Sequence, residues 1–116
     1  MKPQRITLLT LPLSPNSVYA HMGRRRFMTT RGKENKEQMA WEARRQHRGV
    51  PIAGPVSLKI ALWWPTRANR DLDNIKLLLD ALTGILWLDD SQIQKMEIEK
   101  GYDKENPRVE IEYREI

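Results

Sequence analysis

Two short acidic segments carry the side chains of this sequence that are best suited to chemistry. Asp71 and Asp73 lie two residues apart in the segment 70–74 (RDLDN), and Asp89 and Asp90 form a second pair. In an extended connection, residues two apart point to the same side. If the chain between the segments folds back, Asp90 joins Asp71 and Asp73. Three gathered carboxylates repel one another and need a cation, and such hard oxygen ligands select Mg²⁺ or Mn²⁺ over Zn²⁺.

A Mg²⁺ ion held by carboxylates completes its shell with water and substrate phosphate, which suits it to phosphodiester hydrolysis. Lys76, on the first turn of the helix expected next, would supply a cation for the developing negative charge. A structural interpretation competes with this one, because Asp and Asn cap helix N-termini and Asp-Asp-Ser is a typical turn. The pattern alone leaves helix capping and metal binding open as alternatives.

The charge distribution favours a polyanionic partner. The chain of 116 residues has a net charge of +5, but residues 1–70 hold 14 Lys and Arg against 3 Asp and Glu, whereas residues 71–116 hold 6 against 12. The planar guanidinium fork of Arg matches phosphate oxygens, so nucleic acid is the favoured partner, with a merely solvated basic face as the alternative. The candidate DNA-binding residues are Arg24, Arg25, Arg26, Arg67, Arg70 and Asn74.

The elements that must position these residues are read from their periodicity. We expect strands at residues 5–11, 56–64, 93–100 and 107–115, helices at 30–48 and 74–83, and a long loop at 12–33. Thr30 is the expected N-cap of the first helix, and Gly84 the C-cap of the second. The pattern predicts a single domain over residues 1–116. Its expected class is α+β, with a small mixed or antiparallel sheet and two helices in two layers.

Composition excludes several classes of protein. Cys is absent, which rules out disulfides and a Cys nucleophile, and the two His, His21 and His47, are expected at the surface. We expect neither a signal peptide nor a membrane span, and hence a cytoplasmic protein. Trp64 and Trp87 are expected in the core, whereas Trp63 falls on the opposite strand face, at a dimer contact or a DNA surface.

Three stretches resemble the RusA family of Holliday junction resolvases, which are small endonucleases of bacteria and their phages. They are residues 12–19 (PLSPNSVY), 70–74 (RDLDN), and 80–84 (DALTG) leading into 87–93 (WLDDSQI). The resemblance implies an α+β fold, a homodimer, and Mg²⁺-dependent cleavage of branched, four-way DNA by paired nicks, with Mn²⁺ as a substitute metal.

The resemblance also implies roles for individual residues. Asp71, Asp73 and Asp90 would be the metal-binding catalytic carboxylates, with Asp89 either orienting Asp90 or sharing its role. Lys76 would be the catalytic lysine, although it follows Asn74 by two residues where the family has three, and one residue turns a helix by about 100°. A non-catalytic junction-binding protein that retains the fold is therefore the alternative, and an RNA-binding accessory protein ranks third.

Overall fold

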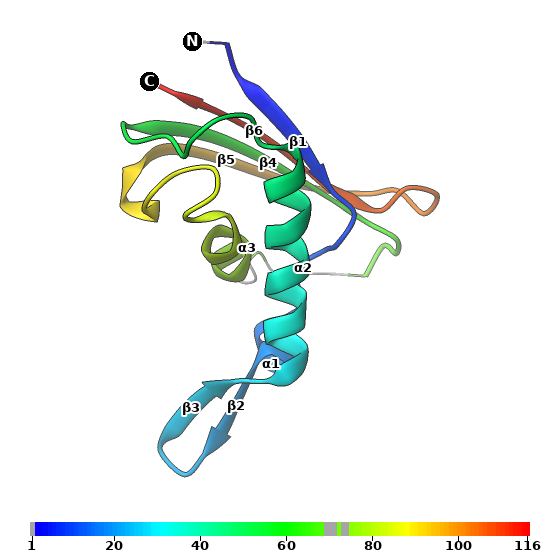
Figure 1. The fold of residues 1–116 in the computed structure, drawn as a ribbon. Coiled ribbons are helices and arrows are strands. Elements are labelled where there is room, and N and C mark those ends of the chain that lie inside the picture. The colour runs from blue at the N-terminus through cyan, green and yellow to red at the C-terminus, as the bar shows by residue number, and fades with distance from the viewer. Residues whose placement is uncertain (1, 69–71, 73–74) are drawn as a thin grey trace.

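The computed structural model describes residues 2–68, 72 and 75–116 (Figure 1). In chain order its elements are β1 (Gln4–Leu8), α1 (Pro15–Val18), β2 (Tyr19–Met22), β3 (Arg25–Met28), α2 (Thr30–Gln46), β4 (Val56–Trp64), α3 (Ile75–Leu82), the 3₁₀ turn η1 (Asp90–Gln92), β5 (Ile93–Tyr102) and β6 (Arg108–Glu115). The described helices include none long and apolar enough to cross a membrane.

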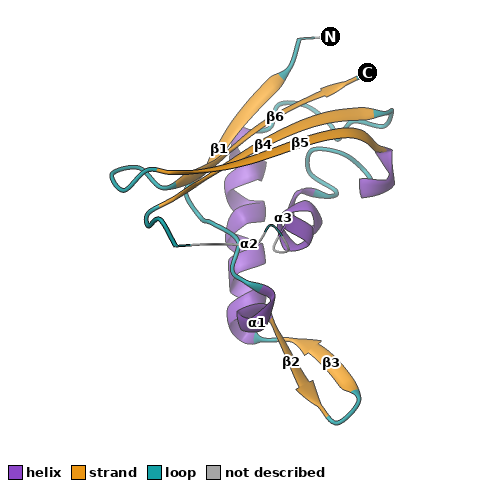
Figure 2. Cartoon of the chain, turned by 180° about the vertical axis from the view of Figure 1, so that it is seen from behind, coloured by secondary structure: helices purple, strands orange, loops and turns teal. Residues whose placement is uncertain are grey.

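Four strands form a mixed sheet in the order β1-β6-β4-β5. β6 pairs antiparallel with both β1 and β4, while β4 and β5 run parallel. A parallel pair needs a crossover connection, and α3 lies on the one that joins β4 to β5. Helices α2 and α3 lie against one face of the sheet (Figures 1 and 2), so the expected two-layer α+β class is confirmed.

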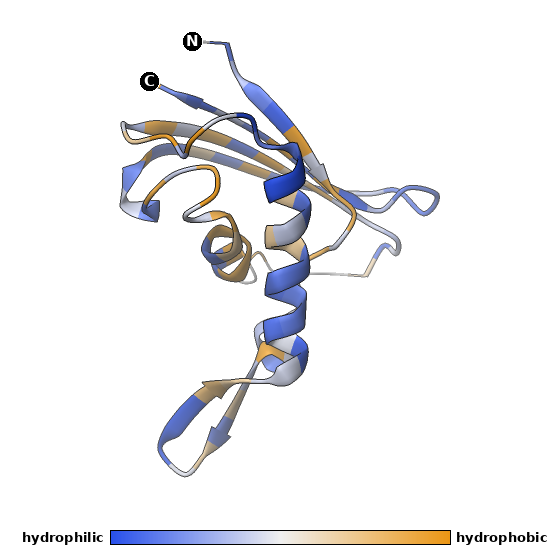
Figure 3. Cartoon of the chain, viewed as in Figure 1, coloured by the Kyte–Doolittle hydropathy of each residue, from blue (hydrophilic) through white to orange (hydrophobic). Residues whose placement is uncertain are grey.

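The core lies between the sheet and the two helices. Alternate residues of β4 and β6 are buried there, as the period-two pattern predicts: Val56, Leu58, Ile60, Leu62, Val109, Ile111 and Tyr113. Trp87 is fully buried, as expected, and Trp64 packs against the core while partly exposed. Figure 3 shows α3 as mostly apolar and α2 as mostly polar, so α3 is the helix with the wider buried face.

The N-cap of helix α2 lies one residue earlier than expected, and the helix ends two residues sooner. Its N-cap is Thr29 rather than Thr30, and the Thr29 side chain accepts a hydrogen bond from the Gly32 N–H at 3.0 Å. The helix ends at Gln46, and His47 follows as the C-cap. His47 is partly buried instead of lying free at the surface, because its Nδ1 lies 2.6 Å from the Tyr113 hydroxyl.

The prediction of a long loop at 12–33 is wrong, and β1 ends at Leu8 instead of residue 11. The segment forms α1 and then a hairpin of β2 and β3, which projects away from the body of the molecule (Figures 1 and 2). Met22 pairs with Arg25, so Gly23 and Arg24 make a two-residue turn, with Gly23 at φ 63°. Glycine at the first turn position is typical of tight hairpins, and this signal was available in the sequence.

Candidate active site

Helix α3 places Lys76 at the surface beside the core. Ile75, Leu77 and Leu78 are buried, and they fix the rotation of the helix about its axis. Lys76 falls between them in sequence but on the outer side, with 71% of its side chain exposed. Its Nζ lies 3.3 Å from the Asp80 carboxylate one helical turn later. This hydrogen bond raises the pKa of Lys76 above its ordinary value, with a smaller contribution from Asp90.

The chain returns from α3 to the sheet through a tight connection in which Leu86 and Trp87 are buried. Gly84 adopts a positive φ of 89°, as expected of a residue that ends a helix. The indole N–H of Trp87 donates to the Thr83 hydroxyl at 3.1 Å. The backbone of Ile52 makes two hydrogen bonds to this connection: its N–H donates to the Leu86 carbonyl, and its own carbonyl accepts from the Leu88 N–H. The connection therefore delivers the second acidic pair to a defined place.

The two carboxylates of the second acidic pair have different surroundings. Asp89 is the N-cap of η1, and its side chain accepts hydrogen bonds from the Ser91 N–H and hydroxyl. These bonds hold the pKa of Asp89 below its ordinary value. Asp90 is 40% exposed, and its Oδ2 lies 4.0 Å from Lys76 Nζ. The described contacts of Asp89 are thus those of a capping residue, whereas the Asp90 carboxylate faces Lys76.

Gln92 holds the turn that carries Asp90. Its Oε1 accepts from the Asp89 N–H at 2.7 Å, which completes a capping box. Its Nε2 donates to the carbonyls of Ile52 and Gly54, both at 2.8 Å. One side chain therefore ties η1 to the segment that precedes β4. Sequence reasoning missed Gln92, although Asp89 and Gln92 have the three-residue spacing of a capping box.

The remaining predicted residues of this centre are not placed. Asp71, Asp73, Arg70 and Asn74 lie outside the described residues. Among the residues that are described, no group of three or more His, Asp or Glu side chains is arranged to hold a metal ion. Asp90 supplies an accessible hard oxygen donor of the kind that Mg²⁺ prefers. The donor set predicted from the sequence consists of carboxylates and so fits Mg²⁺.

The predicted basic residues divide between two regions. Arg24, Arg25 and Arg26 lie on the projecting hairpin, and all three are exposed. Arg67 follows β4, and its guanidinium lies 4.4 Å from the centroid of the Tyr102 ring. Tyr102 is the last residue of β5, whereas η1, which carries Asp90, directly precedes the first residue of β5. The length of the strand, about 30 Å, therefore separates Tyr102 from η1. The structure therefore does not bring Arg67 to Asp90.

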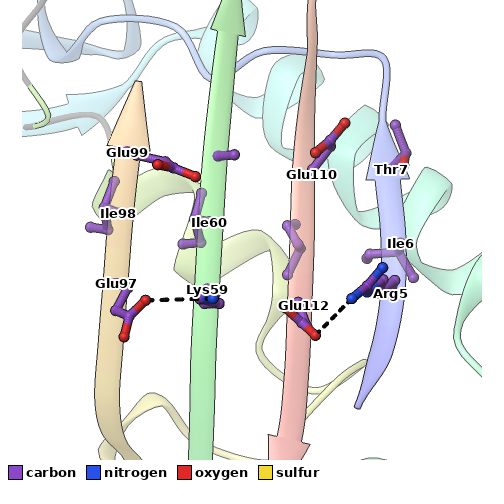
Figure 4. A pocket seen from close by; sticks show the side chains of 12 residues that line it. Arg5, Ile6, Thr7, Lys59, Ile60, Glu97, Ile98, Glu99, Glu110 and Glu112 are labelled. Atoms are coloured by element: carbon purple, nitrogen blue, oxygen red, sulfur yellow. Dashed lines mark hydrogen bonds and ion pairs between the residues drawn. The ribbon is translucent and has the colours of Figure 1, made fainter. Parts of the chain in front are cut away.

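The sheet face opposite the helices is hollowed and charged (Figure 4). Lys59 lies 3.8 Å from Glu97, and Arg5 lies 3.2 Å from Glu112 across neighbouring strands. The two charges within each pair neutralise one another, so this face lacks the excess of positive charge that favours phosphate. Trp63 belongs to this face, beneath the Arg108 guanidinium at 5.0 Å, and its expected role at a dimer or DNA contact stays a prediction.

Comparison with known proteins gives a consistent result. A family model described as Endodeoxyribonuclease RusA matches residues 11–114. Two relatives named crossover junction endodeoxyribonuclease RusA, from Escherichia coli strain K12 and from Enterobacteria phage 82, are each 34% identical over 102 residues. One from Shigella sonnei is 33% identical. Each of these matches covers 80% of this chain and 85% of the relative.

Proposed function

Because the chain belongs to the RusA family of endodeoxyribonucleases, we propose that it resolves Holliday junctions. In this proposal it cuts four-way DNA by Mg²⁺-dependent hydrolysis of phosphodiester bonds, with Mn²⁺ as a substitute metal. The observation that carries the proposal is the approach of Lys76 to Asp90, with Nζ and Oδ2 4.0 Å apart on side chains that both remain accessible. A carboxylate and an ammonium from separate segments meet where a phosphate and a cation would bind.

Asp90 acts in this proposal together with Asp71 and Asp73 as the ligands of Mg²⁺. The ion, when bound, activates water and neutralises charge on the phosphate. Lys76 stabilises the negative charge that develops on the phosphate oxygens. Asp80 keeps the ammonium beside the site through their 3.3 Å contact. The contact of Lys76 with Asp90 supports the view that the shorter spacing from Asn74 still delivers the lysine to the carboxylates.

The basic residues bind the arms of the junction in this proposal. The hairpin that carries Arg24, Arg25 and Arg26 projects from the body of the molecule, where it reaches a DNA arm. Arg70, next to Asp71 in the sequence, grips the phosphates of the strand that is cut, and Arg67, which lies beside Tyr102, contacts the backbone away from Asp90. A homodimer would place two such sites for the two nicks of a symmetric junction. The DNA substrate implies that the protein acts in the cytoplasm of a bacterial cell, whether a chromosome or a phage encodes it.

A synthetic four-way junction tests the proposal against a linear duplex of matched sequence. We expect symmetric nicks in the junction with Mg²⁺ or Mn²⁺, none with EDTA, and none in the duplex. Asp90→Asn should slow the nicking about 100- to 1000-fold while junction binding persists, because removing one negative charge does not weaken the attraction to DNA. Tight junction binding without nicks in either metal would refute catalysis and identify a non-catalytic junction-binding protein.

A further inference from the structure

A small cavity lies between the base of the hairpin and the first turn of α3. Its volume is about 180 Å³, and it is lined by Tyr19, Arg26 and Lys76 together with apolar side chains that include Leu13 and Leu77. Two cations thus border one cavity, and its described lining contains no carboxylate, while Asp80 and Asp90, which contact Lys76 Nζ at 3.3 Å and 4.0 Å, lie outside that lining. This combination favours an anion.

Arg26 and Arg25 point to opposite faces of the hairpin. In an antiparallel pair, residues opposite each other share a face, and successive residues alternate between faces. His21 pairs with Arg26, which places Arg26 on the face that carries Tyr19. Met22 pairs with Arg25, so Arg25 lies on the other face. Of the three hairpin arginines, Arg26 is the one that lines the cavity with Lys76.

Tyr19 holds the Arg26 side chain in place. The guanidinium carbon of Arg26 lies 3.8 Å from the centroid of the Tyr19 ring, which is the geometry of a cation–π contact. Stacking on a ring leaves the N–H groups at the edge of the guanidinium available for phosphate oxygens. A side chain ordered in this way also loses less rotamer freedom when it binds.

We propose that this cavity is a phosphodiester-binding subsite, in which Arg26 and Lys76 together hold the strand that is cut and Tyr19 is a positioning residue for Arg26. The inference rests on the proposed function, because it assigns the cavity to the same cleavage reaction. It separates Arg26, which aligns the reacting strand, from Arg24 and Arg25, which bind a DNA arm.

The test is single-turnover cleavage of the four-way junction at saturating protein, with junction affinity measured separately in EDTA. We expect Arg26→Ala to slow the saturated rate about 10- to 100-fold, since misplacing a reacting group by about 1 Å has effects of this size. Free guanidinium should restore part of that rate. Arg25→Ala should chiefly weaken affinity and slow the saturated rate less. Arg114→Ala, an exposed arginine of β6, is the matched control outside the DNA-binding regions.

The role of Tyr19 is tested by keeping or removing its ring. Tyr19→Phe retains the ring and should cleave within about 2-fold of the unaltered chain, whereas Tyr19→Leu should be slower by about 2- to 5-fold, the size of an exposed cation–π contact. In the Arg26→Ala background, Tyr19→Leu should have no further effect on the rate. An equal effect in both backgrounds would mean that Tyr19 does not act through Arg26.

Two outcomes overturn the inference and are distinguishable. Equal saturated rates for Arg26→Ala and Arg25→Ala, without rescue by guanidinium, would refute the subsite while cleavage by the unaltered chain still supports the proposed function. Absence of nicks by the unaltered chain in both Mg²⁺ and Mn²⁺ would refute the two together. Thermal melting of each variant shows whether the fold is retained.

Discussion

Replacing Gln92 with Ala should both destabilise the protein and slow cleavage, although Gln92 carries no charge. The side chain makes one hydrogen bond to the Asp89 N–H and two to the carbonyls of Ile52 and Gly54. All three are lost in Gln92→Ala. The turn that carries Asp90 then loses its link to the segment before β4.

The magnitude follows from the number and type of these bonds. A neutral hydrogen bond contributes about 0.5–1.5 kcal/mol, so three contribute about 2–4 kcal/mol to the free energy of unfolding. In a chain of this size, such a loss lowers the melting temperature by about 10 °C. Movement of Asp90 by about 1 Å should in addition slow cleavage by up to about 100-fold.

Urea denaturation and single-turnover junction cleavage measure the two effects. Gln94→Ala is the matched control, because Gln94 lies two residues further along on β5 and is exposed. We expect this control to change stability by less than about 0.5 kcal/mol. If Gln92→Ala loses no more stability than Gln94→Ala, the three hydrogen bonds do not hold the turn. If it loses stability but cleaves at the normal rate, Gln92 does not position Asp90.

Three further predictions follow from the described contacts. Asp90→Asn should reduce cleavage about 100- to 1000-fold. Asp89→Asn should cleave normally and melt at nearly the same temperature as the unaltered chain, because Asn caps a helix as well as Asp does. Equal losses of cleavage in the two variants would contradict this division of roles. Burial raises the pKa of Tyr113 to about 12, while the unfolded chain releases this proton near pH 10. The free energy of unfolding should therefore fall as the pH rises from 10 to 12, and urea titrations of Tyr113→Phe should lack that part of the fall. Gly32→Ala should destabilise the protein by about 1–3 kcal/mol, as measured by urea denaturation, although Ala favours helices. The reason is that the added Cβ would lie 2.9 Å from both Cγ1 and the carbonyl oxygen of Val18. A stabilised variant would show that α1 shifts readily to make room for the methyl group.

Much of the fold follows from patterns that act over a few residues. The alternation along 56–64 and 107–115 matches the period of a strand, and burial of every second residue then requires one covered face. The apolar spacing of 74–83 similarly specifies a helix with a buried side. The two acidic segments and Lys76 stand out for the same local reason, since their residue types and spacing can be read without knowing the fold.

Other features depend on contacts between distant parts of the chain. The hairpin was missed because the Pro and Gly residues in 12–33 are typical of loops. Their positions do not reveal that Tyr19 pairs with Met28. Asp89 and Asp90 are adjacent and identical in type, so only the hydrogen bonds of η1 distinguish the capping residue from the one facing Lys76.

The approach of Lys76 to Asp90 depends on the tertiary structure for the same reason. The sequence predicts which residues have the chemistry for a phosphodiesterase site. The distance between them depends on how α3 packs on the sheet and on how the connection through Trp87 returns to η1. Side-chain chemistry is a property of each residue, whereas proximity is a property of the packed chain.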